Sequence, residues 1–314
     1  MIILSRTVSV RRCEIACDES QTEKGCLVVE NDWNANLVDR IREAQNDPRT
    51  VEELVSIALS EQNENAAWDV VLILHLRGTL EVFDAARLLC QSSCAAEQTL
   101  GANILGQLGV PDRSFPDESV DILLSLIQSD RDADVLDAAC IALGHIHEPR
   151  SIPSICNLAS HSSTEVRYAV AYALGAFADE LAIETLLSLV KDPEESVRDW
   201  AMFALGSQCD VDTPEIRDAL LQGTADRVEV VRGEALVGLA NRHDDRVIEP
   251  IIRELLTWKT ARDTHFAIDA AEAIASPQLL LTLLQIKEGI DLSDTRYDDA
   301  IRLCSAQCLS DKEP

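Results

Sequence analysis

The chain is poor in basic residues and in aromatic residues, and it has no long apolar run. Its 314 residues include 27 Lys and Arg against 55 Asp and Glu, which gives a formal net charge of −28. A surface this acidic repels phosphate backbones, so binding to nucleic acid is not expected. No apolar run reaches the roughly 18 residues that a membrane-spanning helix needs. The apolar start before Arg6 is also too short for a secretory signal. We therefore expect a cytoplasmic protein with no membrane partner, whose charge favours basic protein partners.

The cysteines do not suggest a disulfide framework. Ten cysteines in a long chain without a secretory signal are typical of reduced, mostly buried thiols. Only the pair Cys13 and Cys17, which precedes the predicted helices, leaves a redox role open. Apolar residues make up 46% of the chain, which is enough to bury a large core.

The most informative feature that is present is an internal repeat. The pattern VRYAVAYALG at 166–175 recurs as VRDWAMFALG at 197–206 and as VRGEALVGLA at 231–240. Weaker copies end at His75, Gly106, Gly144 and Ala275, so successive copies lie 31 to 38 residues apart. Between copies lies a second segment whose apolar residues also have helical spacing, for example AIETLLSLV at 182–190. Each repeat is therefore predicted to be two antiparallel helices, A and then B, which bury a core only by stacking on their neighbours.

This pattern predicts an all-α fold, a right-handed solenoid of about seven helix pairs over residues 35–290. Residues 1–34 show no helical period, and we expect them to form a loose or partly extended lead-in. Residues 291–314 are expected to form a capping helix, which begins near 294, and a tail.

An acid in the turn between helices A and B recurs together with an arginine at the start of helix B. Asp192 precedes Arg198 by six residues, and Asp226 precedes Arg232 by the same interval. We expect the acid to accept hydrogen bonds from the free amides at the start of helix B. The arginine, like Arg167 in the previous copy, is expected to reach the turn of a neighbouring repeat. We interpret these residues as a structural ladder and not as ligand contacts.

The Val-Arg…Ala-Leu-Gly pattern resembles the short HEAT-like repeats of the phycobilisome-lyase type. The resemblance covers roughly residues 35–287 and is strongest over 130–241. It implies an α-α superhelix. It does not imply one function, because families with this repeat include enzymes, chaperone-like lyases and adaptors.

The repeat lacks the metal-binding pairs of deoxyhypusine hydroxylase, a HEAT-repeat enzyme whose di-iron site uses His-Glu pairs directly after the Val-Arg. The matching pairs here are Asp137-Ala138, Tyr168-Ala169, Asp199-Trp200 and Gly233-Glu234, none of which is His-Glu. A second group, Cys140, His145, His147 and Cys156, lies within seventeen residues but lacks the paired spacings typical of zinc ligands. We expect no metal, no cofactor and no catalytic residues.

The candidate site lies on helix B. When the leading Val of each copy is counted as position zero, positions two, three and six are expected to face the concave side of the solenoid. Aromatic residues are only 4% of the chain, yet four occupy these positions in two consecutive copies. The predicted partner-binding residues are Tyr168, Tyr172, Trp200 and Phe203, an apolar extension at Ile141 and Val237, and an acidic edge at Asp137, Asp199 and Glu234. Aromatic anchors with a polar rim are typical of protein-binding hot spots. The alternative is that these rings, Trp200 above all, pack between repeats as core.

Two functions remain open. The first is a non-enzymatic scaffold or adaptor that binds a protein or peptide in a concave, acidic and aromatic groove. The second is an enzyme component resembling the phycobilin lyases, which handles a linear tetrapyrrole on a client protein. In that case the Tyr and Trp rings would hold the flat chromophore, and Asp199 would pair with its pyrrole nitrogens.

Overall fold

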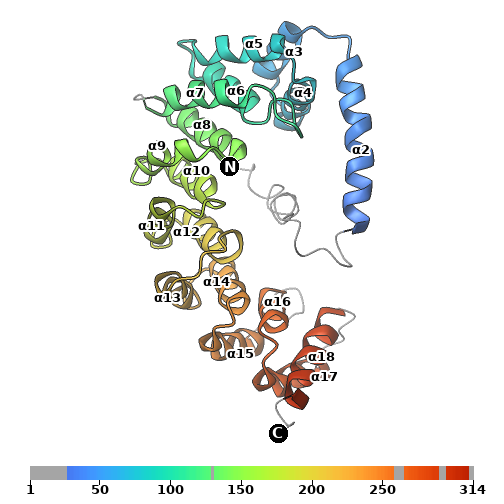
Figure 1. Ribbon diagram of the computed structural model, residues 1–314, viewed down its shortest axis with the longest axis vertical. Helices are drawn as coiled ribbons and strands as arrows, with labels where there is room; N and C mark the ends of the chain where they lie inside the picture. Colours follow the sequence, from blue (N-terminus) through green and yellow to red (C-terminus); the bar gives the residue numbers. More distant parts are fainter. Residues whose placement is uncertain (1–26, 129–130, 258–264, 290–294, 311–314) are drawn as a thin grey trace. The chain divides into compact units, whose positions relative to one another are not determined.

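All regular elements that the computed structural model describes are helical (Figure 1). The model describes residues 27–128, 131–257, 265–289 and 295–310. Within these ranges, none of the helices combines the length and the apolar character that a membrane span requires. The prediction of an all-α fold built from stacked helix pairs is confirmed. The chain divides into two units, residues 1–158 and 159–314.

The described part of unit 1 consists of a long helix, three helix pairs and a short helical segment that follows them. Its helices are α2 (Leu27–Asn46), α3 (Val51–Ser60), α4 (Glu64–Arg77), α5 (Leu80–Cys90), α6 (Ala95–Gly106), α7 (Pro116–Ile127), α8 (Ala133–Ile146), the 3₁₀ turn η1 (Pro149–Ser151) and the short α9 (Ile152–Cys156). Helices α4, α6 and α8 contain the three weak copies of the repeat, and each contacts the next. They are therefore the B helices of this unit.

Unit 2 is also built from paired helices. It contains α10 (Thr164–Leu174), α11 (Glu180–Leu189), α12 (Glu195–Phe203), the π-helical turn η2 (Ala204–Gln208), α13 (Pro214–Gly223), α14 (Glu229–Asn241), η3 (Asp245–Val247), α15 (Ile248–Thr257), α16 (His265–Ile274), η4 (Pro277–Leu279), α17 (Leu280–Gly289) and α18 (Thr295–Ser310). The B helices α10, α12, α14, α16 and α18 contact one another in that order (Figure 1). A continuous row of B helices is thus available to carry side chains on one face.

The ends of the chain differ in part from the prediction. Helix α2 begins at Leu27, so the last residues of the segment expected to be a loose lead-in are helical. This helix packs against α4. The packing stabilises a helix that the weak periodicity of the local sequence does not predict. The rest of the lead-in, with Cys13 and Cys17, lies outside the described residues. The predicted C-terminal helix is present as α18.

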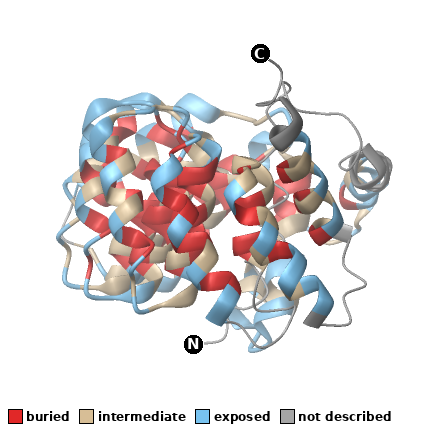
Figure 2. Ribbon diagram, turned by 90° about the horizontal axis from the view of Figure 1, so that it is seen from below, coloured by how far each residue is buried: buried red, intermediate tan, exposed pale blue. Residues whose placement is uncertain are grey.

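The core lies between the helices, where small side chains let them approach (Figure 2). Ala169, Ala171 and Ala173 of α10 are at most 2% exposed. A Cβ atom on Gly238 of α14 would lie 2.6 Å from the Cα of Gly206, so these two backbones nearly touch. The alternation of small and branched residues in helix B therefore sets the close spacing of the row.

Candidate functional site

The arginine ladder that the repeat pattern predicts is present in unit 2. Arg167 donates to Asp192 at 2.7 and 3.0 Å, and Arg198 donates to Asp226 at 2.8 and 3.1 Å. Each aspartate also accepts a backbone amide two residues later, at 2.9 Å for Asp192 and 2.8 Å for Asp226. Burial alone would raise the pKa of Asp192, but the bonds from Arg167 and the amide outweigh it and hold that pKa below its usual value. Each arginine therefore ties its own helix to the following turn.

At both ends of the ladder, a different residue takes the place of the aspartate. Arg232 donates to the carbonyls of Asp226 and Arg227 in its own turn, as Arg198 does in its turn, but its carboxylate partner is Glu254 on α15, at 2.6 Å from Nε to Oε1. At the other end His161 stands in the acid's place, and its Nδ1 accepts the amide of Ser163 at 3.1 Å. An imidazole nitrogen can perform this capping role because it carries an acceptor lone pair. The ladder holds the B helices in a common register, so equivalent positions lie on one face.

The four predicted rings come together on this face around Trp200. The ring centroid of Trp200 lies 5.6 Å from that of Tyr168, 5.2 Å from that of Tyr172 and 5.4 Å from that of Phe203. These distances are within the 4.5–7 Å range of favourable aromatic pairs. Trp200 is only 6% exposed, whereas the other three rings are half-buried. We call this group, Tyr168, Tyr172, Trp200 and Phe203, the aromatic face.

Two residues predicted to be exposed are buried. Trp200 packs between repeats, which is the alternative raised by the sequence, and it acts as the hub of the other rings. Glu234 is 7% exposed, so it does not form an accessible acidic edge. The B helices pack closely here. Helix α12 contacts α10, and α14 contacts both α12 and η2, where a Cβ added to Gly206 would lie 3.1 Å from the backbone oxygen of Glu234.

The remaining predicted residues are half-buried. Asp199 lies next to Trp200 on α12, and Val237 lies on α14. Asp137 and Ile141 lie on α8, in unit 1. Gly233 on α14 has no side chain, and the ring of Phe266 from α16 lies against it in place of one. Within unit 2 the structure therefore brings the four rings of the aromatic face together, with Asp199 adjacent to Trp200 in the chain and Val237 on the next B helix.

Three carboxylates farther along the row were missed. Asp269 and Glu272 on α16 and Asp299 on α18 lie close enough to influence one another. Burial raises the pKa of Glu272, and the negative charges of Asp299 and Asp269 raise it further. The signal was available, because Glu272 occupies position six of the weak copy at 266–275.

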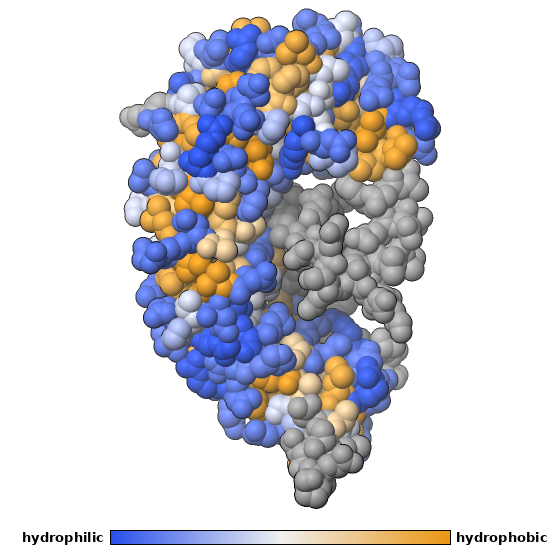
Figure 3. Space-filling view, in the orientation of Figure 1, coloured by the Kyte–Doolittle hydropathy of each residue, from blue (hydrophilic) through white to orange (hydrophobic). Residues whose placement is uncertain are grey.

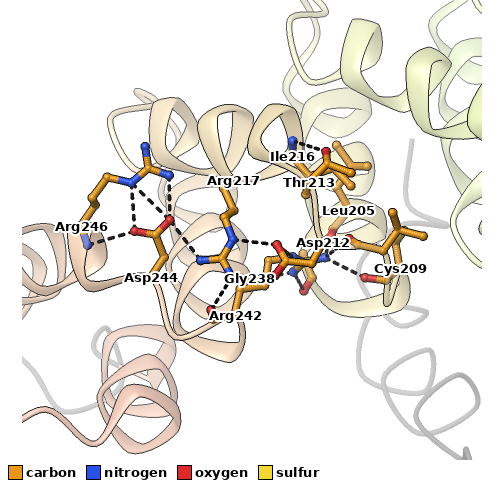
Figure 4. A network of polar contacts seen from close by, with 12 residues as sticks. Leu205, Cys209, Asp212, Thr213, Ile216, Arg217, Gly238, Arg242, Asp244 and Arg246 are labelled. Carbon is orange, nitrogen blue, oxygen red and sulfur yellow. Dashed lines mark hydrogen bonds and ion pairs between the residues drawn. The ribbon is translucent and has the colours of Figure 1, made fainter.

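A second polar network lies where the B helices end (Figure 4). Arg242 is 8% exposed and donates to the carbonyls of Leu205, Gly206 and Cys209 at 2.7–2.8 Å. Burial lowers the pKa of this guanidinium. The carbonyls belong to the π-helical turn η2 and the residue after it, where regular helical bonding stops. We assign the network to the stability of this turn.

The possible zinc ligands do not form a cluster. Cys140 is fully buried, and its burial raises the pKa of the thiol. Over the residues that the structure describes, no group of three or more His, Cys, Asp or Glu side chains is placed to hold a metal ion. The expectation that the protein carries no iron or zinc stays a prediction.

Comparisons with known proteins identify the repeats. A sequence model of HEAT repeats matches residues 120–206. The solved structure of YibA from Escherichia coli is 26% identical, with a TM-score of 0.67 over 91% of this chain and 99% of that chain. An engineered protein is 19% identical, with a TM-score of 0.51 over 83% of this chain and 78% of that chain. The complex of CpcE and CpcF of phycocyanin lyase from Nostoc is 17% identical, with a TM-score of 0.44 over 83% of this chain and 96% of that chain.

A search of curated proteins found no match. The likeness to YibA nevertheless extends over nearly all of both chains. The repeat pattern, the row of contacting B helices and the match over 120–206 agree with it. Residues 120–206 therefore contain HEAT repeats, and the fold of the chain resembles that of YibA over nearly its whole length.

Proposed function

We propose that the protein is a non-enzymatic scaffold or adaptor that binds a protein segment on the aromatic face. The observation that carries the proposal is the convergence of three half-buried rings on the buried Trp200. A buried hub fixes the orientation of Tyr168, Tyr172 and Phe203, so little side-chain freedom is lost when a partner covers them. Rigid aromatic side chains of this kind are enriched at binding hot spots.

The charge of the chain favours a basic partner. Asp199 is half-buried beside the rings, and the whole chain carries a net charge of −28. Cationic side chains are attracted both to the carboxylate and to the faces of Tyr and Trp rings. Val237 in unit 2 and Ile141 in unit 1 occupy position six of their copies, and Asp137 in unit 1 occupies position two. We propose that each of these three residues is a further partner contact within its own unit. Glu234 is buried, so we assign it no direct contact.

The proposal is tested by the double variant Tyr168→Ala/Phe203→Ala. Peptides are first selected from a random displayed library on the wild-type protein, and their affinity is then measured by calorimetry. Because hot-spot rings contribute most of the binding free energy, we expect the variant to bind at least about tenfold more weakly. Its melting temperature is expected to fall only modestly, because both rings are half-buried.

The matched control is Trp68→Ala, which removes an exposed aromatic ring from α4 in unit 1. This variant is expected to bind the selected peptides as the wild type does. Unchanged affinity in Tyr168→Ala/Phe203→Ala would contradict the proposal. A double variant that is unfolded at room temperature would show that the rings serve as core.

The tetrapyrrole alternative has a separate test. The protein is mixed with a linear tetrapyrrole, and the absorbance spectrum is recorded. We expect no change. A stoichiometric complex with a red-shifted spectrum that is lost in Tyr168→Ala/Phe203→Ala would replace the scaffold proposal with the lyase-like one.

A further inference from the structure

The type of residue at one position of the repeat, position six, changes from helix to helix along the row of B helices in unit 2. Position six is Tyr172 on α10, Phe203 on α12, Val237 on α14 and Glu272 on α16. All four side chains are half-buried, and the four helices contact one another in this order. The column therefore runs from aromatic through aliphatic to acidic, and it has two chemically different ends.

The acidic end carries more negative than positive charge. Asp269 pairs with Arg296 at 3.4 Å, and Asp299 pairs with Arg302 at 2.9 Å. No arginine is paired with Glu272 in the part of the chain that the structure describes. Burial is the main cause of the raised pKa of Glu272, and the carboxylates of Asp299 and Asp269 raise it further, while Arg302 and Arg296 act in the opposite direction and do not cancel the shift. Bringing a cation to this end would relieve that repulsion.

Between the two ends, the residue of the column on α14 is apolar. Position two of this helix is Gly233, which is buried against the ring of Phe266, and that ring is itself buried. Val237 is the half-buried residue of the column on the same helix. A peptide that crosses α14 would therefore meet apolar surface, with no charged side chain of the column in its path.

We propose that the partner is an extended segment with an apolar anchor on the aromatic face and basic side chains near Glu272, about six residues away from the anchor. This inference rests on the proposed function and names the partner of that same face. The supporting argument is charge complementarity at one end of the column and apolar complementarity at the other.

The spacing follows from helix packing. Packed helices lie about 8–10 Å apart, and Phe203 and Glu272 are two helices apart, so the two ends are separated by roughly 20 Å. An extended peptide advances about 3.3 Å per residue. Roughly six residues therefore separate the anchor from the basic side chains.

The probes are three fluorescently labelled peptides that differ in one rigid spacer. Each has a Leu-Phe anchor and three arginines, separated by two, six or ten prolines. Polyproline advances about 3.1 Å per residue, so the spacers measure about 6, 19 and 31 Å. By fluorescence anisotropy we expect the six-proline peptide to bind about tenfold more tightly than the other two, because only its two ends engage together.

Two matched charge reversals test the acidic end. Glu272→Lys places a cation near the carboxylates of Asp269 and Asp299 and near their partners Arg296 and Arg302, so attraction and repulsion offset each other and the variant is expected to fold. Glu249→Lys changes the net charge equally on α15, at an exposed position outside the column. We expect Glu272→Lys to reduce the affinity of the six-proline peptide about tenfold, to the level of the other peptides, and Glu249→Lys to leave it unchanged.

The outcomes separate this inference from the proposed function. Equal binding of all three peptides, unaffected by Glu272→Lys but lost in Tyr168→Ala/Phe203→Ala, would refute the spacing and leave the aromatic face as the binding site. Binding lost in Glu272→Lys but unaffected by Tyr168→Ala/Phe203→Ala would refute both. Failure of all three peptides to bind would refute the inference, and the proposed function would then be judged by its library-selected peptides.

Discussion

At the scale of single residues, the rings of the aromatic face differ in role: the buried ring mainly stabilises the fold, and we propose that the half-buried rings bind the partner. Trp200 is 6% exposed and touches three other rings, whereas Tyr172 is half-buried at the edge of the group. Burial of a large aromatic side chain stabilises the fold, and an accessible ring can still gain free energy from a partner. Neighbouring residues on one face therefore have different consequences when they are removed.

Trp200→Ala is expected to lower the free energy of unfolding by about 3–5 kcal/mol, because it leaves a cavity among the rings. Tyr172→Ala is expected to lower it by less than about 2 kcal/mol, because part of that ring already faces solvent. Urea unfolding followed by circular dichroism measures both. Equal losses would show that the two rings are buried alike.

His75 is a second residue whose environment has a measurable consequence. It is 3% exposed on α4, and its Nε2 lies 2.9 Å from the carbonyl oxygen of Asn103. Burial lowers the pKa of His75 to about 4, with Arg113 contributing in the same direction. In the unfolded chain the pKa of His75 is near 6.5, so between about pH 6.5 and 4 the unfolded state binds a proton that the folded state does not bind. The free energy of unfolding therefore decreases as the pH falls through this range.

The loss from this residue is expected to be on the order of 3 kcal/mol at the acidic end of that range. His75→Gln keeps a hydrogen-bond donor but does not titrate, so its free energy of unfolding should fall less steeply with pH. Urea unfolding of both proteins at several pH values between 7 and 4 measures the difference. Parallel pH profiles would contradict the assignment.

At the scale of elements, the ladder and the small residues fix how the B helices stack. Arg198 is held by Asp226 of the next turn and by the carbonyls of Asp192 and Pro193 in its own turn, at 2.9 and 3.0 Å. Three groups from two repeats thus share one buried guanidinium, whose side chain is 8% exposed. The cost of breaking such a pair lies mainly in the charge that remains buried and unpaired.

Asp226→Ala is expected to destabilise unit 2 by about 2–4 kcal/mol, somewhat below the cost of breaking a fully buried pair, because the Asp226 side chain is 16% exposed. The matched control is Asp39→Ala, which removes the partner of Arg42 in an exposed pair of similar length, 2.7 Å. Exposed pairs contribute little, so the control is expected to change stability by less than about 0.5 kcal/mol. Thermal unfolding measures the stability of both variants. Equal losses would show that the buried pair of the ladder stabilises the protein no more than an exposed ion pair does.

At the scale of the whole molecule, negative charge is the dominant property. The net charge of −28 is spread over a surface on which hydrophilic residues cover most of the visible face and hydrophobic residues gather in separate patches (Figure 3). Long-range attraction of a basic partner is then screened by salt over about 8 Å at physiological ionic strength, whereas ring contacts are not. The two contributions can therefore be separated by ionic strength.

Asp199→Lys is expected to weaken the binding of a basic peptide most strongly at low salt, because the lost attraction is electrostatic. Tyr168→Ala/Phe203→Ala should weaken the same peptide by a similar factor at low and high salt. Anisotropy titrations over a range of salt concentrations test both statements. An affinity that responds neither to salt nor to Asp199→Lys would limit the acidic surface to a role in solubility.

The local and periodic features were determined by the sequence itself. The B helices at 166–175, 197–206 and 231–240 follow from a repeated apolar pattern, and the ladder follows from a constant interval between Asp and Arg. Both depend on residues close together in the chain or on a relation that recurs from copy to copy. Such features can be predicted because each repeat contacts mainly its neighbours.

Exposure was decided only by the tertiary structure. Trp200, Glu234 and Asp269 share position three of the repeat, yet the first two are buried and the third is half-buried. A single copy specifies which way a side chain points from its own helix, but the next helix in the row decides whether that side chain is covered. Arg242 shows the same limit, because its partners are carbonyls released by a π-helical turn more than thirty residues earlier in the chain. These relations depend on the shift and rotation of one helix against the next, which packing sets and a repeat pattern does not encode.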